Sequence, residues 1–265
     1  MPFGKLRLLF LSESEPSPES VLILDSVAIQ SSKLTPYSVY GENQLQPING
    51  PEVPEAARAM AGPVAFLSFI EGGRARTCSG FLIDSNRLLT NEHCVSTPSV
   101  CATTTVVFGY EYDLNGRLGI GPQRRCVSVD EAKVNFELDA SVIELDSPPG
   151  EAFGTIDISA PGEDLSAPLM VIQHPGSQPK QISILDCTVN DPLVDGRGPG
   201  TDFTHTCDTA GGSSGAPILD AQGRLVGLHH FGFEDGEVWT ANRGVHAELI
   251  ANWLSTPIDE HFDDE

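Results

Sequence analysis

The sequence predicts an all-β fold. From residue 63 onward, apolar runs rich in Val, Ile, Leu, Phe and Thr alternate with Gly, Pro, Asn or Asp, which is the pattern of short strands joined by turns. The 26 glycines and 20 prolines among 265 residues suit a folded, turn-rich chain. An α/β fold would need long amphipathic segments between the strands, and only residues 55–60 and 245–254 have the character of helices.

The predicted strands are short and fall into two groups. They comprise residues 64–70, 80–83, 87–90, 103–108, 140–145, 169–172, 181–185, 216–219 and 224–228. A stretch rich in Pro and Gly at residues 149–162 separates the first five runs from the last four. We therefore expect two β units joined by a linker.

Composition divides the chain into five segments. Residues 1–60 carry clusters of Ser, Pro and Glu, which predict a surface arm or a removable prosegment. The other segments are the first β unit at 61–148, the linker at 149–162, the second β unit with its C-terminal helix at 163–256, and an acidic tail at 257–265. We interpret the tail as solvated, because nothing in its spacing demands a metal.

Net charge narrows the classes of partner. Lys and Arg number 15 against 37 Asp and Glu, which gives a net charge of −22 at pH 7. Such an acidic surface repels phosphate backbones and anionic lipids, so we expect neither nucleic-acid binding nor membrane binding. No run of 18 apolar residues occurs, so no membrane-spanning helix is predicted.

The six cysteines indicate the compartment. They are even in number and include no C-x-x-C pair, which argues against a zinc site or a redox pair and favours three disulfides. Disulfides persist in oxidising surroundings, so we expect an extracellular or periplasmic location. The apolar run before Glu13 is too short for an ordinary signal sequence, so this expectation rests on the cysteines.

Three local sequences carry residues suited to nucleophilic catalysis. His93 precedes Cys94, Asp139 begins an apolar strand, and Ser214 lies in the Gly-rich turn at residues 211–215. A serine hydroxyl is a poor nucleophile unless a base removes its proton and a third group fixes the tautomer of that base. The three residues therefore suit the roles of base, orienting carboxylate and nucleophile.

The histidine next to a cysteine, the aspartate-led strand, the Gly-x-Ser-Gly-x-Pro turn and the closing helix occur in this order over about residues 38–254. In this combination the chain resembles the chymotrypsin-like (trypsin-fold) serine peptidases. The resemblance implies two packed antiparallel six-stranded β-barrels with a C-terminal helix. It implies His93 as general base, Asp139 as its orienting carboxylate and Ser214 as nucleophile, with the amides of Gly212 and Ser214 as the oxyanion hole. We therefore expect a monomeric enzyme that hydrolyses protein or peptide substrates without a metal or cofactor.

Within that fold, the form Thr-x-Gly-Gly-x-Ser-Gly and the Val-Gly-Leu-His segment are similar to the bacterial glutamyl endopeptidase branch. The similarity implies that Thr209 and His229 line the primary specificity pocket. Asp208, however, lies where a trypsin keeps the carboxylate that binds Arg or Lys. Specificity for an acidic or for a basic residue before the scissile bond therefore stays open. The segment from Val39 resembles the start of the mature enzyme, which implies that residues 1–38 are removed.

Six cysteines allow fifteen pairings, and we choose the sequential one. A bridge between Cys78 and Cys94 would pin the loop of His93. The full set of predicted bridges is Cys78 with Cys94, Cys101 with Cys126, and Cys187 with Cys207.

Several residues depart from the family's pattern. Asn91 and Glu92 replace the usual two alanines before the histidine, and His230 replaces a serine beneath the aspartate. Ser213 replaces the aspartate that vertebrate-type enzymes pair with a freed N-terminus. These departures leave a second hypothesis open, a protease-like binding module without turnover. A third is a latent enzyme in which residues 1–60 block the cleft.

Overall fold

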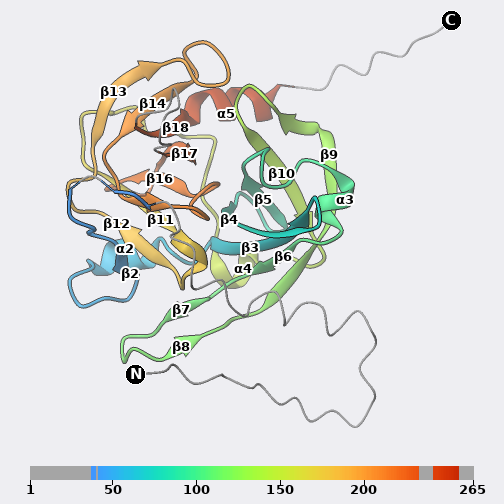
Figure 1. Ribbon diagram of the computed structural model, residues 1–265, viewed down its shortest axis with the longest axis horizontal. Coiled ribbons are helices and arrows are strands. Elements are labelled where there is room, and N and C mark those ends of the chain that lie inside the picture. The colour runs from blue at the N-terminus through green and yellow to red at the C-terminus, as the bar shows by residue number, and fades with distance from the viewer. Residues whose placement is uncertain (1–36, 40, 233–240, 257–265) are drawn as a thin grey trace, which may run out of the picture. The chain divides into compact units, whose positions relative to one another are not determined.

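The computed structural model describes residues 37–39, 41–232 and 241–256, and its first β system is a closed six-stranded barrel in the order β10-β5-β4-β3-β6-β9 (Figure 1). Every neighbouring pair is antiparallel. The six-stranded barrel predicted for this half of the chain is therefore confirmed. Its strands are β3 (Val64–Glu71), β4 (Arg74–Leu82), β5 (Arg87–Thr90), β6 (Thr105–Val107), β9 (Gln123–Asn135) and β10 (Ala140–Leu145).

The second β system is an eight-stranded antiparallel sheet in the order β13-β14-β18-β17-β16-β11-β12-β2. It differs in detail from the predicted second six-stranded barrel, because two more strands join it and, within the described ranges, β13 and β2 form its edges. Its strands are β2 (Gln46–Pro47), β11 (Leu169–Gln173), β12 (Gln181–Ser183), β13 (Val189–Val194), β14 (Asp202–His205), β16 (Pro217–Asp220), β17 (Leu225–Phe231) and β18 (Asn242–His246).

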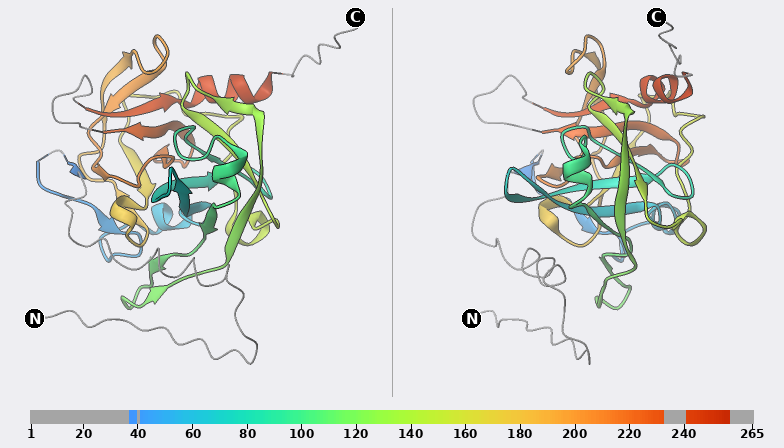
Figure 2. Two further views of the ribbon diagram at one scale, coloured as in Figure 1. Left: turned by 45° about the vertical axis from the view of Figure 1, so that its right-hand side comes forward. Right: turned by 90° about the vertical axis from the view of Figure 1, so that its right-hand side faces the viewer.

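The remaining elements are short. Strand β1 (Tyr37–Ser38) pairs with β15 (Thr209–Ala210), and β7 (Glu111–Tyr112) pairs with β8 (Leu118–Gly119). The helices are α2 (Glu55–Ala59), α3 (Pro98–Cys101), α4 (Gly150–Phe153) and α5 (Ala247–Ser255), with a 3₁₀ turn η1 (Pro175–Ser177). Both predicted helices are therefore present, as α2 and α5. Figure 2 shows α5, in red, beside β17 and β18.

Residues 41–60, predicted as part of a surface arm, pack instead against the folded domain and contribute side chains to its core. Strand β2 pairs with β12, and the side chains of Ile48, Val53 and Ala57 are buried in the largest core cluster. The Pro and Gly content that suggested an arm makes tight turns here, with the Gly50 amide donating to the Pro47 carbonyl at 2.7 Å. Residues 1–36, Tyr40 and the predicted acidic tail at 257–265 lie outside the described residues.

The largest core cluster joins the barrel to the sheet. Phe81 and Val142 come from the barrel, whereas Ile172, Leu219 and Val245 come from the sheet, and all are buried in one cluster. Because burial of apolar surface is the main favourable term in folding, this shared cluster fixes the two β systems against each other.

Three disulfides brace the structure, and they are the predicted pairs Cys78–Cys94, Cys101–Cys126 and Cys187–Cys207. They are in keeping with an oxidising compartment such as the periplasm or the extracellular space. No helix within the described ranges combines the length and the apolar character needed to cross a bilayer.

His174 is a buried histidine in the loop after β11. Its ring packs against Tyr110 and Phe66, and Nδ1 lies 3.1 Å from the carbonyl oxygen of Gln178. Burial, assisted by the nearby Lys180 cation, lowers the pKa of His174 to about 3. The imidazole is therefore neutral at pH 7.

Truncation of a leucine in the shared core should destabilise the protein. Leu219 is fully buried, so Leu219→Ala removes apolar contacts and leaves a cavity, and we expect the free energy of unfolding to fall by about 2–5 kcal/mol. Leu114 is 73% exposed, and Leu114→Ala is the matched control with an expected change within about 0.5 kcal/mol. Urea titrations measure both, and equal losses in the two variants would contradict this description of the core.

His174 should also make stability depend on pH. Its pKa in the folded state, about 3, lies below the ordinary histidine value of about 6.5, so between these values the unfolded state binds a proton that the folded state does not. Stability is therefore lost as the pH falls through this window. His174→Gln should flatten the dependence of unfolding free energy on pH by up to about 1.4 kcal/mol per pH unit. Denaturant titrations between pH 4 and 7 measure the slope, and an unchanged slope would argue against a neutral buried imidazole.

Candidate active site

The three residues predicted for catalysis come from both β systems. His93 lies in the loop after β5, Asp139 lies between β9 and β10, and Ser214 lies in the turn between β15 and β16. The Cys78–Cys94 bridge ties the His93 loop to β4. Sites of this kind need rigid supports, because small displacements of reacting groups slow catalysis strongly.

Asp139 is the buried anion of the site. The carboxylate is fully buried, and its Oδ2 lies 2.7 Å from Nδ1 of His93 while its Oδ1 accepts from the His93 amide at 3.0 Å. Its φ of +44° is in the left-handed region, which residues other than glycine seldom adopt. Two donors hold the backbone there, because the Asn91 side-chain amide and the Glu92 backbone amide donate to the Asp139 carbonyl at 2.8 and 3.1 Å. The structure thus brings His93 and Asp139 together, as predicted.

A second histidine contacts the same carboxylate. His230 on β17 is fully buried, with Nδ1 3.2 Å from Asp139 Oδ2 and Nε2 2.8 Å from Asp202 Oδ2. Burial disfavours the imidazolium, but hydrogen bonds to both carboxylates outweigh it and raise the pKa of His230. For Asp139, burial likewise opposes ionisation, yet hydrogen bonds from His230 and His93 hold its pKa well below the ordinary aspartate value. His230 therefore takes a direct part in the electrostatics of the site.

An arginine completes the surroundings of Asp139. Arg197, in the loop between β13 and β14, places Nη1 3.2 Å from Asp139 Oδ1 and 2.6 Å from Glu92 Oε2. Its guanidinium lies over the Phe136 ring, 4.6 Å from the ring centroid. Sequence reasoning did not select Arg197 or Asp202, because neither belongs to a local motif. The departures at Glu92 and His230 were the available signals.

Ser214 lies in a turn whose backbone is held from several sides. Its carbonyl accepts from the Ser79 amide at 2.7 Å, and its hydroxyl donates to the His230 carbonyl at 3.3 Å. The glycines on either side, Gly212 and Gly215, have φ values of +99° and +84°, which glycine adopts without steric cost. Ser214 and Asp139 thus both contact His230. The Ser214 hydroxyl contacts its backbone carbonyl, and the Asp139 carboxylate contacts its ring.

The backbone amides predicted for the oxyanion hole differ from those of the neighbouring residues in their hydrogen bonding. Those of Ser213 and Gly215 donate to backbone carbonyls within the fold, both at 2.9 Å. In the part of the chain that the structure describes, the amides of Gly212 and Ser214 donate to no protein group. These two donors are therefore available to a ligand oxygen.

The three residues predicted for the specificity pocket have different partners. Asp208 is 3% exposed, and its Oδ2 accepts from the Gln44 backbone amide at 2.8 Å. Thr209 Oγ1 donates to Asn242 Oδ1 at 3.0 Å. His229 is paired through Nδ1 with Nε2 of His205 at 3.2 Å.

The pair of histidines is neutral. Burial lowers the pKa of His205 to about 3, and it lowers the pKa of His229 well below the ordinary value. His205 and Asn242 were not predicted, since they reach the region only through the pairing of β14 and β17 with β18.

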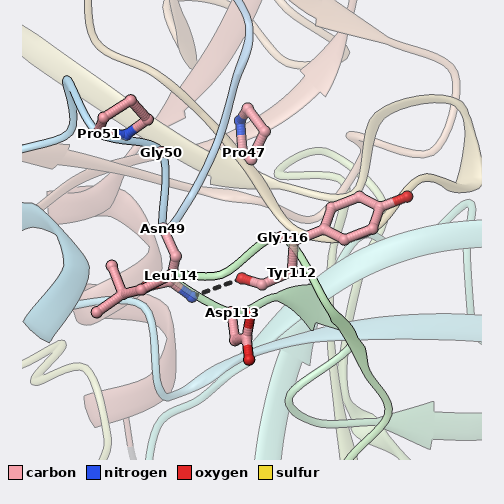
Figure 3. A pocket seen from close by; sticks show the side chains of 8 residues that line it. All are labelled: Pro47, Asn49, Gly50, Pro51, Tyr112, Asp113, Leu114 and Gly116. Carbon is pink, nitrogen blue, oxygen red and sulfur yellow. Dashed lines mark hydrogen bonds between the residues drawn. The ribbon is translucent and has the colours of Figure 1, made fainter.

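A group of potential metal ligands and a surface pocket, both within the described residues, do not extend the candidate site. Cys78, His93 and Cys94 bring potential ligand atoms within 4.8 Å, but the two sulfurs form a disulfide and are not thiolates. An open pocket of about 360 Å³ lies between β2 and the β7–β8 hairpin, where the Asn49 side chain donates to the Tyr112 carbonyl at 2.9 Å (Figure 3). None of its lining residues is a predicted site residue.

Known proteins resemble this chain at several levels. The Sinorhizobium fredii uncharacterized protein y4fB is 31% identical over 171 residues, which cover 59% of this chain and 25% of that protein. Secreted RxLR effector protein 73 of Plasmopara viticola is 29% identical over 166 residues, which cover 58% of this chain and 41% of that protein. The chain thus spans less than half the length of each of these two relatives.

Solved structures and a family model agree on the fold. A Glu endopeptidase structure aligns with a TM-score of 0.58 and 22% identity, covering 82% of this chain and 97% of that chain, a likeness that shows the fold. The model of the trypsin-like peptidase domain matches residues 78–228, which contain His93, Asp139 and Ser214. This chain belongs to the trypsin-like peptidase domain family and has a chymotrypsin-like fold.

Proposed function

We propose that the protein is a serine endopeptidase that uses His93, Asp139 and Ser214. The observation that carries the proposal is the 2.7 Å contact between Nδ1 of the partly exposed His93 and Oδ2 of the fully buried Asp139. A carboxylate on Nδ1 holds that nitrogen protonated, which leaves Nε2 as the basic atom. Membership of a peptidase family and the Gly-rich turn around Ser214 support the same reading.

The proposed reaction is acyl transfer. Ser214 Oγ attacks the scissile carbonyl while Nε2 of His93 takes its proton and later delivers it to the leaving amine, and water then releases the acyl group. The hydroxyl must first turn from the His230 carbonyl toward His93, and such contacts commonly tighten only when substrate binds. Asp139 stabilises the imidazolium that forms on His93.

The oxyanion of the tetrahedral intermediate would lie against the amides of Gly212 and Ser214. Donors that are already oriented and not committed to other protein groups suit this task, and removing one donor from such a hole typically costs about 3–4 kcal/mol of transition-state stabilisation. Ser79 supports the turn, because its hydroxyl donates to the Gly212 carbonyl at 2.9 Å.

For specificity, we propose an acidic residue before the scissile bond. The Asp208 carboxylate already accepts from the Gln44 amide, which weakens the case for a pocket that binds Arg or Lys through it. The His229 ring can donate to a substrate carboxylate, and the Thr209 hydroxyl can do so once it turns from Asn242 Oδ1. The fold resembles that of a protein described as a Glu endopeptidase.

We further propose that the enzyme is exported and matures by loss of residues 1–38. Three disulfides support an oxidising destination. Tyr37 and Ser38 pair with Ala210 and Thr209, directly before the Ser214 turn, so cleavage after Ser38 would release the strand that β1 contributes there.

Labelling by a fluorophosphonate tests the serine mechanism. The chain starting at Val39 should be labelled, Ser214→Ala should not, and His93→Ala should be labelled at least a thousandfold more slowly because the general base is missing. Ser213→Ala is the matched control on the neighbouring serine and should retain labelling. Labelling of Ser214→Ala as fast as wild type, or none of wild type, would contradict the proposal. Wild type that is labelled but hydrolyses no peptide would favour the binding module.

A peptide library tests specificity. Cleavage should occur mainly after Glu, and Thr209→Val should lower kcat/KM for a Glu peptide about 10- to 100-fold more than for a matched Gln peptide, because a donor to the carboxylate is lost. Asp208→Asn should leave the preference for Glu in place. Predominant cuts after Arg or Lys that disappear in Asp208→Asn would instead show a basic pocket.

A further inference from the structure

We propose that His230 is a positioning residue that carries a fixed positive charge behind Asp139, so that the enzyme stays active at lower pH than it would without that charge. The inference rests on the proposed function of His93 and Asp139, and it deepens it by adding Asp202 and His230 to the same site.

The geometry is a continuous chain of four side chains. Asp202 Oδ2 lies 2.8 Å from His230 Nε2, His230 Nδ1 lies 3.2 Å from Asp139 Oδ2, and that oxygen lies 2.7 Å from His93 Nδ1. Asp202, His230 and Asp139 are all fully sequestered from solvent. Water cannot supply the hydrogen bonds that these groups need, so they must satisfy one another.

The number of N–H donors that the contacts of His230 require determines the charge of its ring. A neutral imidazole has one N–H and can donate to one carboxylate, whereas ionised carboxylates only accept. His230 has a carboxylate oxygen at each ring nitrogen, so both contacts are hydrogen bonds only when both nitrogens are protonated. Burying two anions with one cation between them is far less costly than burying either anion alone. The raised pKa of His230 agrees with this count.

Other charged groups lie near these four side chains, but none of them replaces the cation of His230. Arg197 contacts the other oxygen of Asp139 but is neutralised by Glu92, 2.6 Å away. His205 on β14 and His229 on β17 interact with His230 electrostatically, and burial keeps both neutral by lowering their pKa values. The titratable and charged groups facing His230 are thus Asp139, His93, Arg197 and Glu92 from the loops, Asp202 and His205 from β14, His229 from β17, and Arg243 from β18 through Asp202.

His93 and His230 share one oxygen of Asp139. Oδ2 of Asp139 faces both imidazoles, so the charge that would stabilise protonated His93 is partly neutralised by His230. The His230 cation also repels the second proton that His93 would take up on Nε2. Asp202 lies on the far side of His230 and compensates for this repulsion less. The charge on His230 therefore opposes a second positive charge on His93, while the two bonds on Oδ2 hold the carboxylate toward the His93 ring.

The test removes both outer charges together. In the Asp202→Asn/His230→Asn double variant no buried ion is left unpaired, and the acid limb of kcat/KM on a peptide substrate should move up by roughly half to one pH unit. The midpoint of the His93 ring titration, followed by NMR in a Ser214→Ala background, should move up equally. This second readout needs no turnover. If the double variant does not fold, His230→Asn alone should move both in the same direction.

The control is His174→Gln, which removes a buried histidine outside the cluster and should leave both midpoints in place. The proposal would be overturned if, in the double variant, the acid limb of kcat/KM and the midpoint of the His93 ring titration are unchanged or move to lower pH. If wild type shows no turnover while the NMR midpoint still moves up, the peptidase proposal fails and the role of His230 stands.

Discussion

A carboxylate that water cannot reach must find its hydrogen bonds and its counter-charges within the protein, and Asp139 is such a group at the junction of barrel and sheet. It is fully buried, yet its pKa lies well below the ordinary value because the imidazoles of His230 and His93 outweigh the cost of burial. Removing a single partner from such a cluster leaves an uncompensated buried charge, which is costly. Much of the local structure can be understood as the means of keeping that anion satisfied.

The partners of Asp139 are supplied by distant parts of the chain. The loop after β5 contributes His93 and Glu92, the β13–β14 loop contributes Arg197, and β17 contributes His230. The shared apolar cluster holds barrel and sheet together, and the Cys78–Cys94 bridge fixes the first of these loops. On a chain with a net charge of −22, the positive charges of Arg197 and His230 lie at the one carboxylate that the proposed chemistry needs.

The parts of this arrangement that sequence predicts are those encoded locally. Five of the six barrel strands are apolar runs that the sequence marks, whereas β9 is largely polar and exposed and was not predicted. His93 and Ser214 each lie in a recognisable motif. Strands β13 and β14 were missed because Val189–Val194 contains Asn, Asp and Pro, as edge strands tolerate, and Asp202–His205 is largely polar although buried. Glu92 and His230 could be seen only as departures from a pattern. Their partners Arg197 and Asp202 lie 105 and 28 residues away along the chain, so only the fold reveals the cluster.

The central claim is that Asp139 is an anion held between two imidazoles, of which His230 is charged. Neutron diffraction from crystals grown near neutral pH tests it most directly, because deuterium on each ring nitrogen can be located. Deuterium on both Nδ1 and Nε2 of His230, and on Nδ1 of His93, with none on the Asp139 carboxylate, is the predicted result. A bare nitrogen on His230, or a deuterium on Asp139, would contradict the account.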